Sequence, residues 1–315
     1  MGKKSRIKSR SQVAETPAGE VGPRQPCPCG SGRRYKACHG SADGPPPAFV
    51  RRPFEGMPGE CDLIALRELV PSATAPLTVP GAGERTVLVT SLNPGAVPAL
   101  VRDDGTIWLG LQVQHAYGDP SRDLAAVLTK ALDAEHGTSV GLTTAPAPDA
   151  PRLQDLVEQD ALDVTVHEGF AWWVADVDDE DGSLAAALEQ ADAAATPTLR
   201  LTSVDAAYWT DVGSKEHLRW VMPHDEDALL DALARLHAAG RTGLVEDSRL
   251  VGMFRAHGLL VPVWDLAVGT GAEALEEPAA AFATALDEAL AATTPLTAEE
   301  RSARSGLANR QLTIR

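Results

Sequence analysis

The sequence is poor in cysteine and has no long apolar run, and both scarcities exclude classes of protein. Only four of its 315 residues are cysteines, too few and too clustered for a disulfide framework. No stretch approaches the ~18 uninterrupted apolar residues of a membrane-spanning helix, and the basic N-terminus is not followed by the apolar core of a signal peptide. With 44% hydrophobic positions, the chain is neither collagen-like nor wholly disordered. We expect a soluble, cytoplasmic protein.

Positive charge is also scarce, and much of it lies at one end. The formal net charge is −16, but residues 1–52 contain eleven Lys or Arg and three acids, so this segment carries +8 and residues 53–315 carry −24. An acidic body rarely binds nucleic acid, whereas a short basic arm can neutralise phosphates and release counterions. The alternatives are a solubilising tail and an arm that binds the protein's own acidic body. We expect no sequence-specific DNA binding.

Composition and hydrophobic patterning divide the chain into five parts. Residues 1–22 are rich in Lys, Arg and Ser and then in Ala, Gly, Pro and Glu, which predicts a disordered basic arm. Residues 23–44 hold three cysteines, and the Pro-rich residues 45–75 indicate an extended linker with a short helix near Asp62–Leu69. Strand and helix patterns then predict an α+β fold, with mixed sheets and flanking helices in two similar α/β units, residues 76–195 and 196–315.

The predicted duplication rests on a recurring order of elements. Each half contains a hairpin, a helix capped by an aspartate, a short helix and a strand that bears a tryptophan. In the first half these lie at Asp104-Gly105, Asp119-Pro120, 152–159 and 162–177, and in the second at Gly213-Ser214, Asp225, 250–254 and 259–267. We therefore expect Trp108 to match Trp220 and Trp172 to match Trp264. A capping box of Thr297 and Glu300 predicts a last helix near residues 299–307.

One cluster of residues has the spacing of a metal site. Cys27 and Cys29 are separated by one residue, and after eight more residues Cys38 is followed directly by His39. Three thiolates and one imidazole suit tetrahedral Zn²⁺, and four protein ligands leave no open position for a reactive water. We therefore expect one structural zinc ion, bound by Cys27, Cys29, Cys38 and His39. Cys61 is interpreted as a lone thiol outside this set; the alternative is that it replaces His39 if the linker folds back.

The residues around this cluster carry a resemblance to a known motif. Residues 26–40 resemble the SEC-C zinc motif, best known from the C-terminal end of the SecA preprotein translocase, in their cysteine spacing, Pro28, Gly30-Ser31-Gly32, the run from Arg33 to Lys36 and Cys38-His39. The resemblance implies the same four zinc ligands and a role in docking to a partner such as the ribosome or a secretion chaperone. The body has no phosphate-binding loop of the translocase motor. It resembles an actinobacterial family of unknown function and, in its strand and helix order, SseB-like domains.

These observations favour a non-enzymatic adaptor, in which a zinc docking module and a basic arm are joined to an acidic body that binds a second protein. The basic side chains that we expect to contact the partner, a protein or the ribosome, are Lys3, Lys4, Arg6, Lys8, Arg10, Arg33, Arg34 and Lys36. The alternative is an enzyme of unknown reaction whose site lies in the cleft between the duplicated units. No nucleophile and base pair can be identified in the sequence, so we name no catalytic residue.

Overall fold

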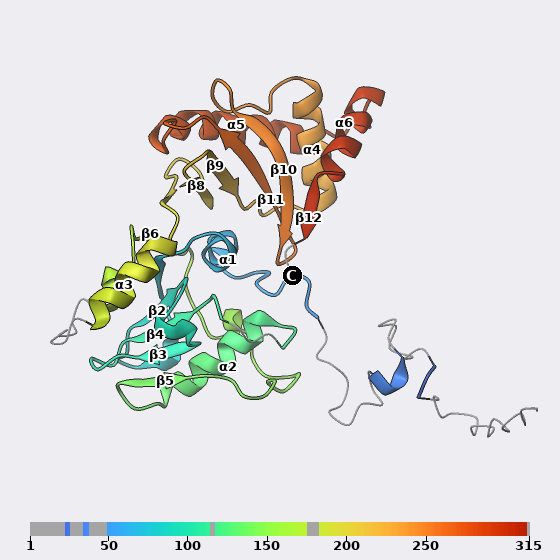
Figure 1. Cartoon of the computed structure of the whole chain (residues 1–315). Helices are drawn as coiled ribbons and strands as arrows, with labels where there is room; N and C mark the ends of the chain where they lie inside the picture. The colour runs from blue at the N-terminus through green and yellow to red at the C-terminus, as the bar shows by residue number, and fades with distance from the viewer. Residues whose placement is uncertain (1–22, 26–33, 38–48, 114–116, 175–182, 314–315) are drawn as a thin grey trace, which may run out of the picture. The chain divides into compact units, whose positions relative to one another are not determined.

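The computed structural model of the chain describes residues 23–25, 34–37, 49–113, 117–174 and 183–313 (Figure 1). The chain forms two units, residues 1–48 and residues 49–315, and we call the second unit the body. Among the described residues of the first unit, Tyr35–Ala37 form a 3-10 helix, η1. The body contains two mixed sheets and several helices, which confirms the predicted α+β class.

The first half of the body is built around a six-stranded sheet with the strand order β5-β3-β4-β2-β1-β6. Neighbouring strands are antiparallel except for β2 and β4, which are parallel. The strands are β1 (Ala73–Leu77), β2 (Val87–Thr90), β3 (Ala99–Val101), β4 (Ile107–Gly110), β5 (Thr138–Val140) and β6 (Thr165–Val166). The helices are α1 (Glu60–Glu68), α2 (Pro120–Leu132) and α3 (Ser183–Ala194), with short 3-10 helices η2 (Pro80–Ala82), η3 (Pro94–Ala96), η4 (Leu153–Asp155) and η5 (Ala171–Val174).

The second half contains another six-stranded sheet, with the order β12-β10-β11-β9-β8-β7. Here β10 and β12 are parallel and the other neighbours are antiparallel. The strands are β7 (Thr198–Arg200), β8 (Ala207–Asp211), β9 (Glu216–Trp220), β10 (Arg249–Ala256), β11 (Leu259–Leu266) and β12 (Gln311–Thr313). The helices are α4 (Glu226–Ala238), η6 (Glu273–Leu275), α5 (Glu276–Leu290) and α6 (Ala298–Ala308), which gather beside β9 to β11 in Figure 1.

Three helices begin at the caps that the sequence predicts. The Asp119 carboxylate accepts a hydrogen bond from the Arg122 amide at the start of α2, and Pro120 occupies the first turn. The Asp225 carboxylate accepts from the amides of Asp227 and Ala228 at the start of α4. Thr297 and Glu300 form the expected capping box of α6. Each cap satisfies backbone donors that have no partner within the helix.

Two apolar cores hold the body together. The second core lies between the second sheet and its helices, where Trp264 packs edge-on against Phe282 of α5 with ring centroids 5.3 Å apart. The first core combines the first sheet, α1 and α2 with residues of the second half, among them Tyr208 and Val261. The two halves therefore share buried apolar surface and do not have wholly separate cores.

The structure differs from an extended linker over the described part of residues 45–75. Phe54, Leu63, Ile64 and Leu66 are fully buried in the first core, the last three on α1. The described part of this stretch is therefore folded despite its prolines, because burial of its large apolar side chains outweighs the preference of proline for extended backbone. From Phe49 onward the chain belongs to the body.

The predicted match between tryptophans fails for both pairs. Trp264 lies in β11, whereas Trp172 lies in the 3-10 helix η5, and the described part of residues 162–177 contains the two-residue strand β6 where a strand pair was expected. Trp108 and Trp220 both lie in strands, but β4 is third in the order of the first sheet and β9 is fourth in that of the second. The short helix expected at 250–254 is part of strand β10, and that expected at 152–159 is reduced to η4.

Candidate docking module and polar clusters of the body

The four predicted zinc ligands, Cys27, Cys29, Cys38 and His39, lie outside the described residues. The same holds for six of the eight basic residues expected to contact a partner: Lys3, Lys4, Arg6, Lys8, Arg10 and Arg33. Arg34 and Lys36 are described, and both side chains are exposed on either side of the half-buried Tyr35. Exposed cationic side chains are free to contact a negatively charged partner.

Two backbone hydrogen bonds join described residues that flank the first two predicted ligands in the sequence. The Tyr35 amide donates a hydrogen bond of 2.7 Å to the Gln25 carbonyl, and the Lys36 amide donates one of 3.0 Å to the Pro23 carbonyl. Two segments that are about ten residues apart are thereby joined. In sequence, the first predicted thiolate follows Gln25 by two residues and the third follows Tyr35 by three. These hydrogen bonds are compatible with a chain that returns to bind one ion.

The chemistry of the predicted donor set fits zinc. Thiolate and imidazole are the ligands that Zn²⁺ takes in structural sites, and three thiolates with one imidazole complete a tetrahedron. Across the described ranges there is no group of three or more His, Cys, Asp or Glu side chains that could hold a metal ion. Any resident zinc would therefore depend on the N-terminal cluster and not on these parts of the body.

Cys61 lies in α1, and its environment opposes metal binding. Burial, together with the charges of Glu60 and Asp62, raises the pKa of the Cys61 thiol to about 12. Zinc binds the thiolate, so a thiol that stays protonated at neutral pH is a poor ligand. This favours the interpretation of Cys61 as a lone thiol over its replacement of His39.

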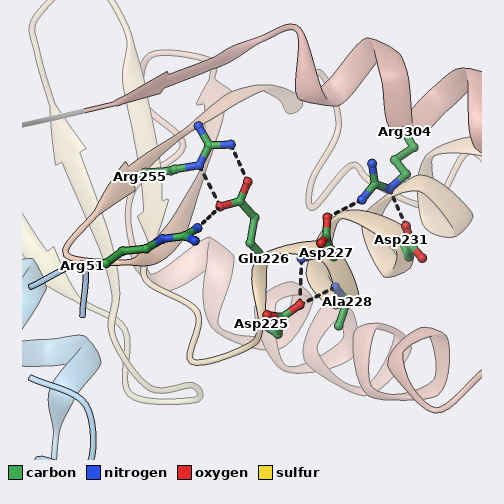
Figure 2. Close-up of polar contacts among 8 residues, drawn as sticks. All are labelled: Arg51, Asp225, Glu226, Asp227, Ala228, Asp231, Arg255 and Arg304. Atoms are coloured by element: carbon green, nitrogen blue, oxygen red, sulfur yellow. Dashed lines mark hydrogen bonds and ion pairs between the residues drawn. The ribbon is translucent and has the colours of Figure 1, made fainter. Parts of the chain in front are cut away.

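Glu226, at the first position of α4, is the centre of a polar cluster in the body (Figure 2). Its carboxylate accepts hydrogen bonds from Arg51 at 2.9 Å and from Arg255 of β10 at 2.8 Å, with a second, shorter contact to Arg255. The bond from Arg255 and the nearby charges of both arginines lower the pKa of Glu226. Arg304 of α6 bonds Asp227 in the first turn of α4 and Asp231 one turn later. These contacts fasten α4 to β10, to α6 and to the segment that begins the body.

A second cluster connects α1 to the second sheet. The Asp62 carboxylate, almost fully buried, accepts two bonds from Arg200 of β7, at 3.0 and 3.1 Å, and one of 2.6 Å from the Tyr208 hydroxyl of β8. The hydrogen bond to Asp62 raises the pKa of the Arg200 guanidinium, so Arg200 is charged at neutral pH. Every oxygen in this cluster is engaged within the body, which indicates a structural role. Sequence patterns missed both clusters because their members lie far apart along the chain.

Two adjoining hollows, of about 340 and 440 Å³, lie at the ends of α4 and α6 and the start of β10. His237 and Arg310 line both, Glu299 and Ser302 line the first, and Ser248 and Arg249 line the second. The Ser248 hydroxyl already accepts bonds from the amides of Leu244 and Val245. All lining residues come from the second half, so these hollows do not coincide with the cleft between the halves that the enzyme interpretation requires.

No helix in the described ranges is both long enough and apolar enough to span a membrane. The comparisons with known proteins agree with the division between N-terminal segment and body. Residues 24–41 match the SEC-C motif. Over 27 residues the chain is 56% identical to the protein translocase subunit SecA of Rubrobacter xylanophilus, a match that covers 9% of this chain and 3% of the translocase. No solved structure matches the chain.

The resemblance of the N-terminal cluster to the SEC-C motif is thus confirmed, and the shared stretch is a small fraction of the translocase. The body has a different match, which extends over residues 53–315. That range covers most of the chain, including both sheets and the helices α1 to α6. The protein therefore belongs to the family of unknown function DUF5926 and carries a SEC-C motif ahead of the family's domain.

Proposed function

We propose that this protein is a non-enzymatic cytoplasmic adaptor, in which the N-terminal module binds one structural zinc ion and docks to a polyanionic partner, the ribosome. A secretion or chaperone factor is the other partner that the motif suggests. The observation that carries the proposal is the SEC-C motif at residues 24–41, with its complete set of four zinc-type ligands. The ligands would be Cys27, Cys29, Cys38 and His39. The ion would hold a module that is too small to have an apolar core.

The charge distribution supports a polyanionic partner. The basic residues form two groups, Lys3 to Arg10 and Arg33 to Lys36, on a chain whose remainder is strongly acidic. If each group contacts phosphates, engagement of one raises the effective concentration of the other. Residues 53–315, at −24, would be repelled from the same surface. Docking is therefore assigned to residues 1–52, and the body is left to bind a second protein.

We also propose that the two halves of the body arose by tandem duplication, and the strand order of their sheets supports this. The order β1-β2-β4-β3-β5 in the first sheet parallels β8-β9-β11-β10-β12 in the second. The central hairpins run in opposite directions, since β4 is parallel to β2 and β11 is antiparallel to β9. A duplication followed by rearrangement of this hairpin accounts for both the shared strand order and the reversed hairpin. The likeness to SseB-like domains is therefore proposed only for the order of strands and helices.

The docking proposal is tested by co-sedimentation of the full chain with ribosomes at low salt. We expect the chain to pellet, and its affinity to fall by roughly 10³ to 10⁵ between about 50 and 200 mM salt if most of the eight basic residues contact phosphates. The variants Cys27→Ser with Cys29→Ser, and Arg34→Gln with Lys36→Gln, should pellet less. The matched control is Lys130→Gln with Arg241→Gln, which removes the same charge from exposed side chains of the body that have no bonded partner within the described ranges.

Each outcome bears on the proposal. If the control variant loses as much binding as Arg34→Gln with Lys36→Gln, the interaction depends only on net charge and the module does not dock. If the full chain fails to pellet at low salt, the ribosome is not the partner. If residues 1–52 then bind residues 53–315 added in trans, the basic arm acts on the protein's own acidic body; if they do not, the arm is a solubilising tail.

A further inference from the structure

The half-buried arginines of the body have a consistent pattern with one exception. Ten of them donate to a carboxylate or to a backbone carbonyl. They are Arg52, Arg67, Arg85, Arg102, Arg122, Arg152, Arg200, Arg235, Arg255 and Arg304. Arg219 of β9 is half-buried as well, but it has no hydrogen-bond or ion-pair partner in the part of the chain that the structure describes. In a chain with this excess of acids, an unpaired arginine needs an explanation.

The register of the second sheet defines the surroundings of Arg219. Tyr208 of β8 and Val263 of β11 are its cross-strand neighbours, and all three lie on the face opposite Leu218 and Trp264, which pack against the helices. Two residues earlier on β9, His217 lies on the same face as Arg219 and pairs across the strands with Asp265. The face therefore carries a row of polar residues beside the guanidinium.

The acids on this face are already engaged. Asp265 accepts a bond of 2.5 Å from Lys215 and lies 3.1 Å from His217 Nδ1. The Tyr208 hydroxyl is directed to Asp62, which Arg200 also binds. On the far side of Asp265, Arg249 of β10 is exposed and has no bonded partner within the described ranges. Lys215, Arg219 and Arg249 thus outnumber Asp265, the carboxylate that β11 contributes to this face, while Asp62 of α1 is paired with Arg200.

Burial lowers the pKa of Arg219, and no neighbouring acid offsets that effect. A guanidinium stays charged at neutral pH even so, because its ordinary pKa lies far above neutral. A partly desolvated charge without a counter-ion is unfavourable. The alternative interpretation is that the aliphatic part of the Arg219 side chain covers Val263 and Tyr208 while its guanidinium is hydrated. An oxyanion that binds the guanidinium would stabilise the folded protein, whereas a merely hydrated guanidinium predicts no such specific stabilisation.

We propose that Arg219 anchors a binding site for the oxyanion group of a small ligand, a carboxylate or a phosphate, on the face of β9 that is turned away from α4 and α5. The planar guanidinium binds either group through two parallel hydrogen bonds. Arg249 supplies a second positive charge near the same face, and Asp265 restricts the site to ligands that avoid its carboxylate. The site lies in the body and is independent of the proposed docking role of residues 1–52.

The test is thermal unfolding of the full chain in buffers of equal ionic strength that contain sodium chloride, inorganic phosphate or succinate. We expect a saturable rise in the melting temperature with at least one of the two oxyanions, because a ligand that binds only the folded state stabilises it. A response to phosphate alone identifies a phosphate site, and a response to succinate alone a carboxylate site. Arg219→Met should abolish the response, and Arg219→Lys, which keeps the charge without the planar fork, should weaken binding at least tenfold.

The matched control is Arg241→Met, which removes an exposed arginine without a bonded partner in the described ranges and should leave the response intact. The proposal is overturned if neither oxyanion gives a saturable rise, or if Arg219→Met and the control respond as the wild type does, since phosphate also stabilises proteins non-specifically. In chloride alone, Arg219→Met should melt no lower than the wild type. A clear fall there would show that the guanidinium has a partner within the chain, and this too would overturn the proposal.

Discussion

Glu226 is the side chain on which three separate parts of the body converge. Arg51 belongs to the segment that begins the body, Arg255 lies in β10, and Glu226 itself begins α4. Only 18% of the Glu226 side chain is exposed, so its charge depends on these two arginines for compensation. The bond from Arg255 lowers the pKa of Glu226 below its ordinary value of 4.5 despite the opposing effect of burial. The ionised carboxylate therefore stabilises the folded state.

We predict that Glu226→Gln lowers the free energy of unfolding by about 1 to 3 kcal/mol at pH 7, the range for loss of hydrogen bonds to charged groups. Because the folded-state pKa of Glu226 is lowered, its contribution is fully present above about pH 4.5 and is lost as the pH falls through the folded-state value. The difference between the two proteins should therefore shrink in acid. Urea unfolding from pH 7 to pH 3 measures it.

Glu277→Gln is the control for this prediction. Glu277 is an acid in the first turn of α5, as Glu226 is in α4, but it is exposed and has no bonded partner in the described residues. Its replacement should change stability by a few tenths of a kcal/mol at most. If both variants lose equal stability with the same dependence on pH, the effect belongs to the helix terminus and not to the arginine pair.

Residue-scale contacts were predictable only where they are local. The zinc-type ligands are recognised from a span of thirteen residues because spacing alone restricts the chemistry. The Asp62–Arg200 pair joins residues that are 138 positions apart, in a chain with 44 acids and 28 basic residues. No property of either residue distinguishes it from the others of its type. Arg219 was not recognised for the same reason, because what marks it is the absence of a partner in the fold.

At the scale of elements, helices with a capping side chain were predicted well and short strands were not. The caps at Asp119, Asp225 and Thr297 act within three residues, so their signal is contained in the local sequence. Residues 250–254 were expected to be helical, but they pair with β11 on one side and β12 on the other. Such pairing is decided by distant segments that a local pattern does not contain.

We predict that Asp225→Ala destabilises the body by about 0.5 to 2 kcal/mol, since it leaves two amides at the start of α4 without their acceptor. Figure 2 shows that this cap lies beside the Glu226 contacts, so fraying of the first turn would also loosen the bonds to Arg51 and Arg255. The free energy of unfolding in urea is the measurement. Glu288→Ala, at an exposed position within α5, is the control and should be close to neutral; an equal loss there would contradict the cap as the cause.

At the scale of the whole molecule, the sequence predicted the class of fold but not how the core of the body is shared. The Pro-rich stretch was expected to separate the zinc module from the first unit, yet Phe54 and the apolar residues of α1 are part of the first core. That core also includes Tyr208 and Val261 of the second half. The hydrophobic pattern of the sequence indicates which face of an element is apolar, but not which distant segment covers that face. A core shared by the two halves of the body was therefore not predicted.

The composition of the two cores leads to a prediction about zinc. Their residues run from Phe54 to Leu307, and none of the described residues of the first unit is among them. We predict one zinc ion per chain by elemental analysis of the full chain, and its loss in the variant Cys27→Ser with Cys29→Ser. Removal of zinc by a chelator should unfold only the first unit, because the metal-binding energy of so small a module is its folding energy. The main calorimetric transition, which reports the body, should barely move.

Cys61→Ser is the control, and it separates the two interpretations of the fourth cysteine. Since burial keeps the Cys61 thiol protonated, with a pKa of about 12, this variant should retain its zinc. Zinc that persists without Cys27 and Cys29, or that is lost with Cys61, would contradict the assigned ligands. A main transition that collapses on chelation would mean that the metal stabilises the body as well. The two units would then be coupled through the ion, and the zinc module could not act as an independent docking element.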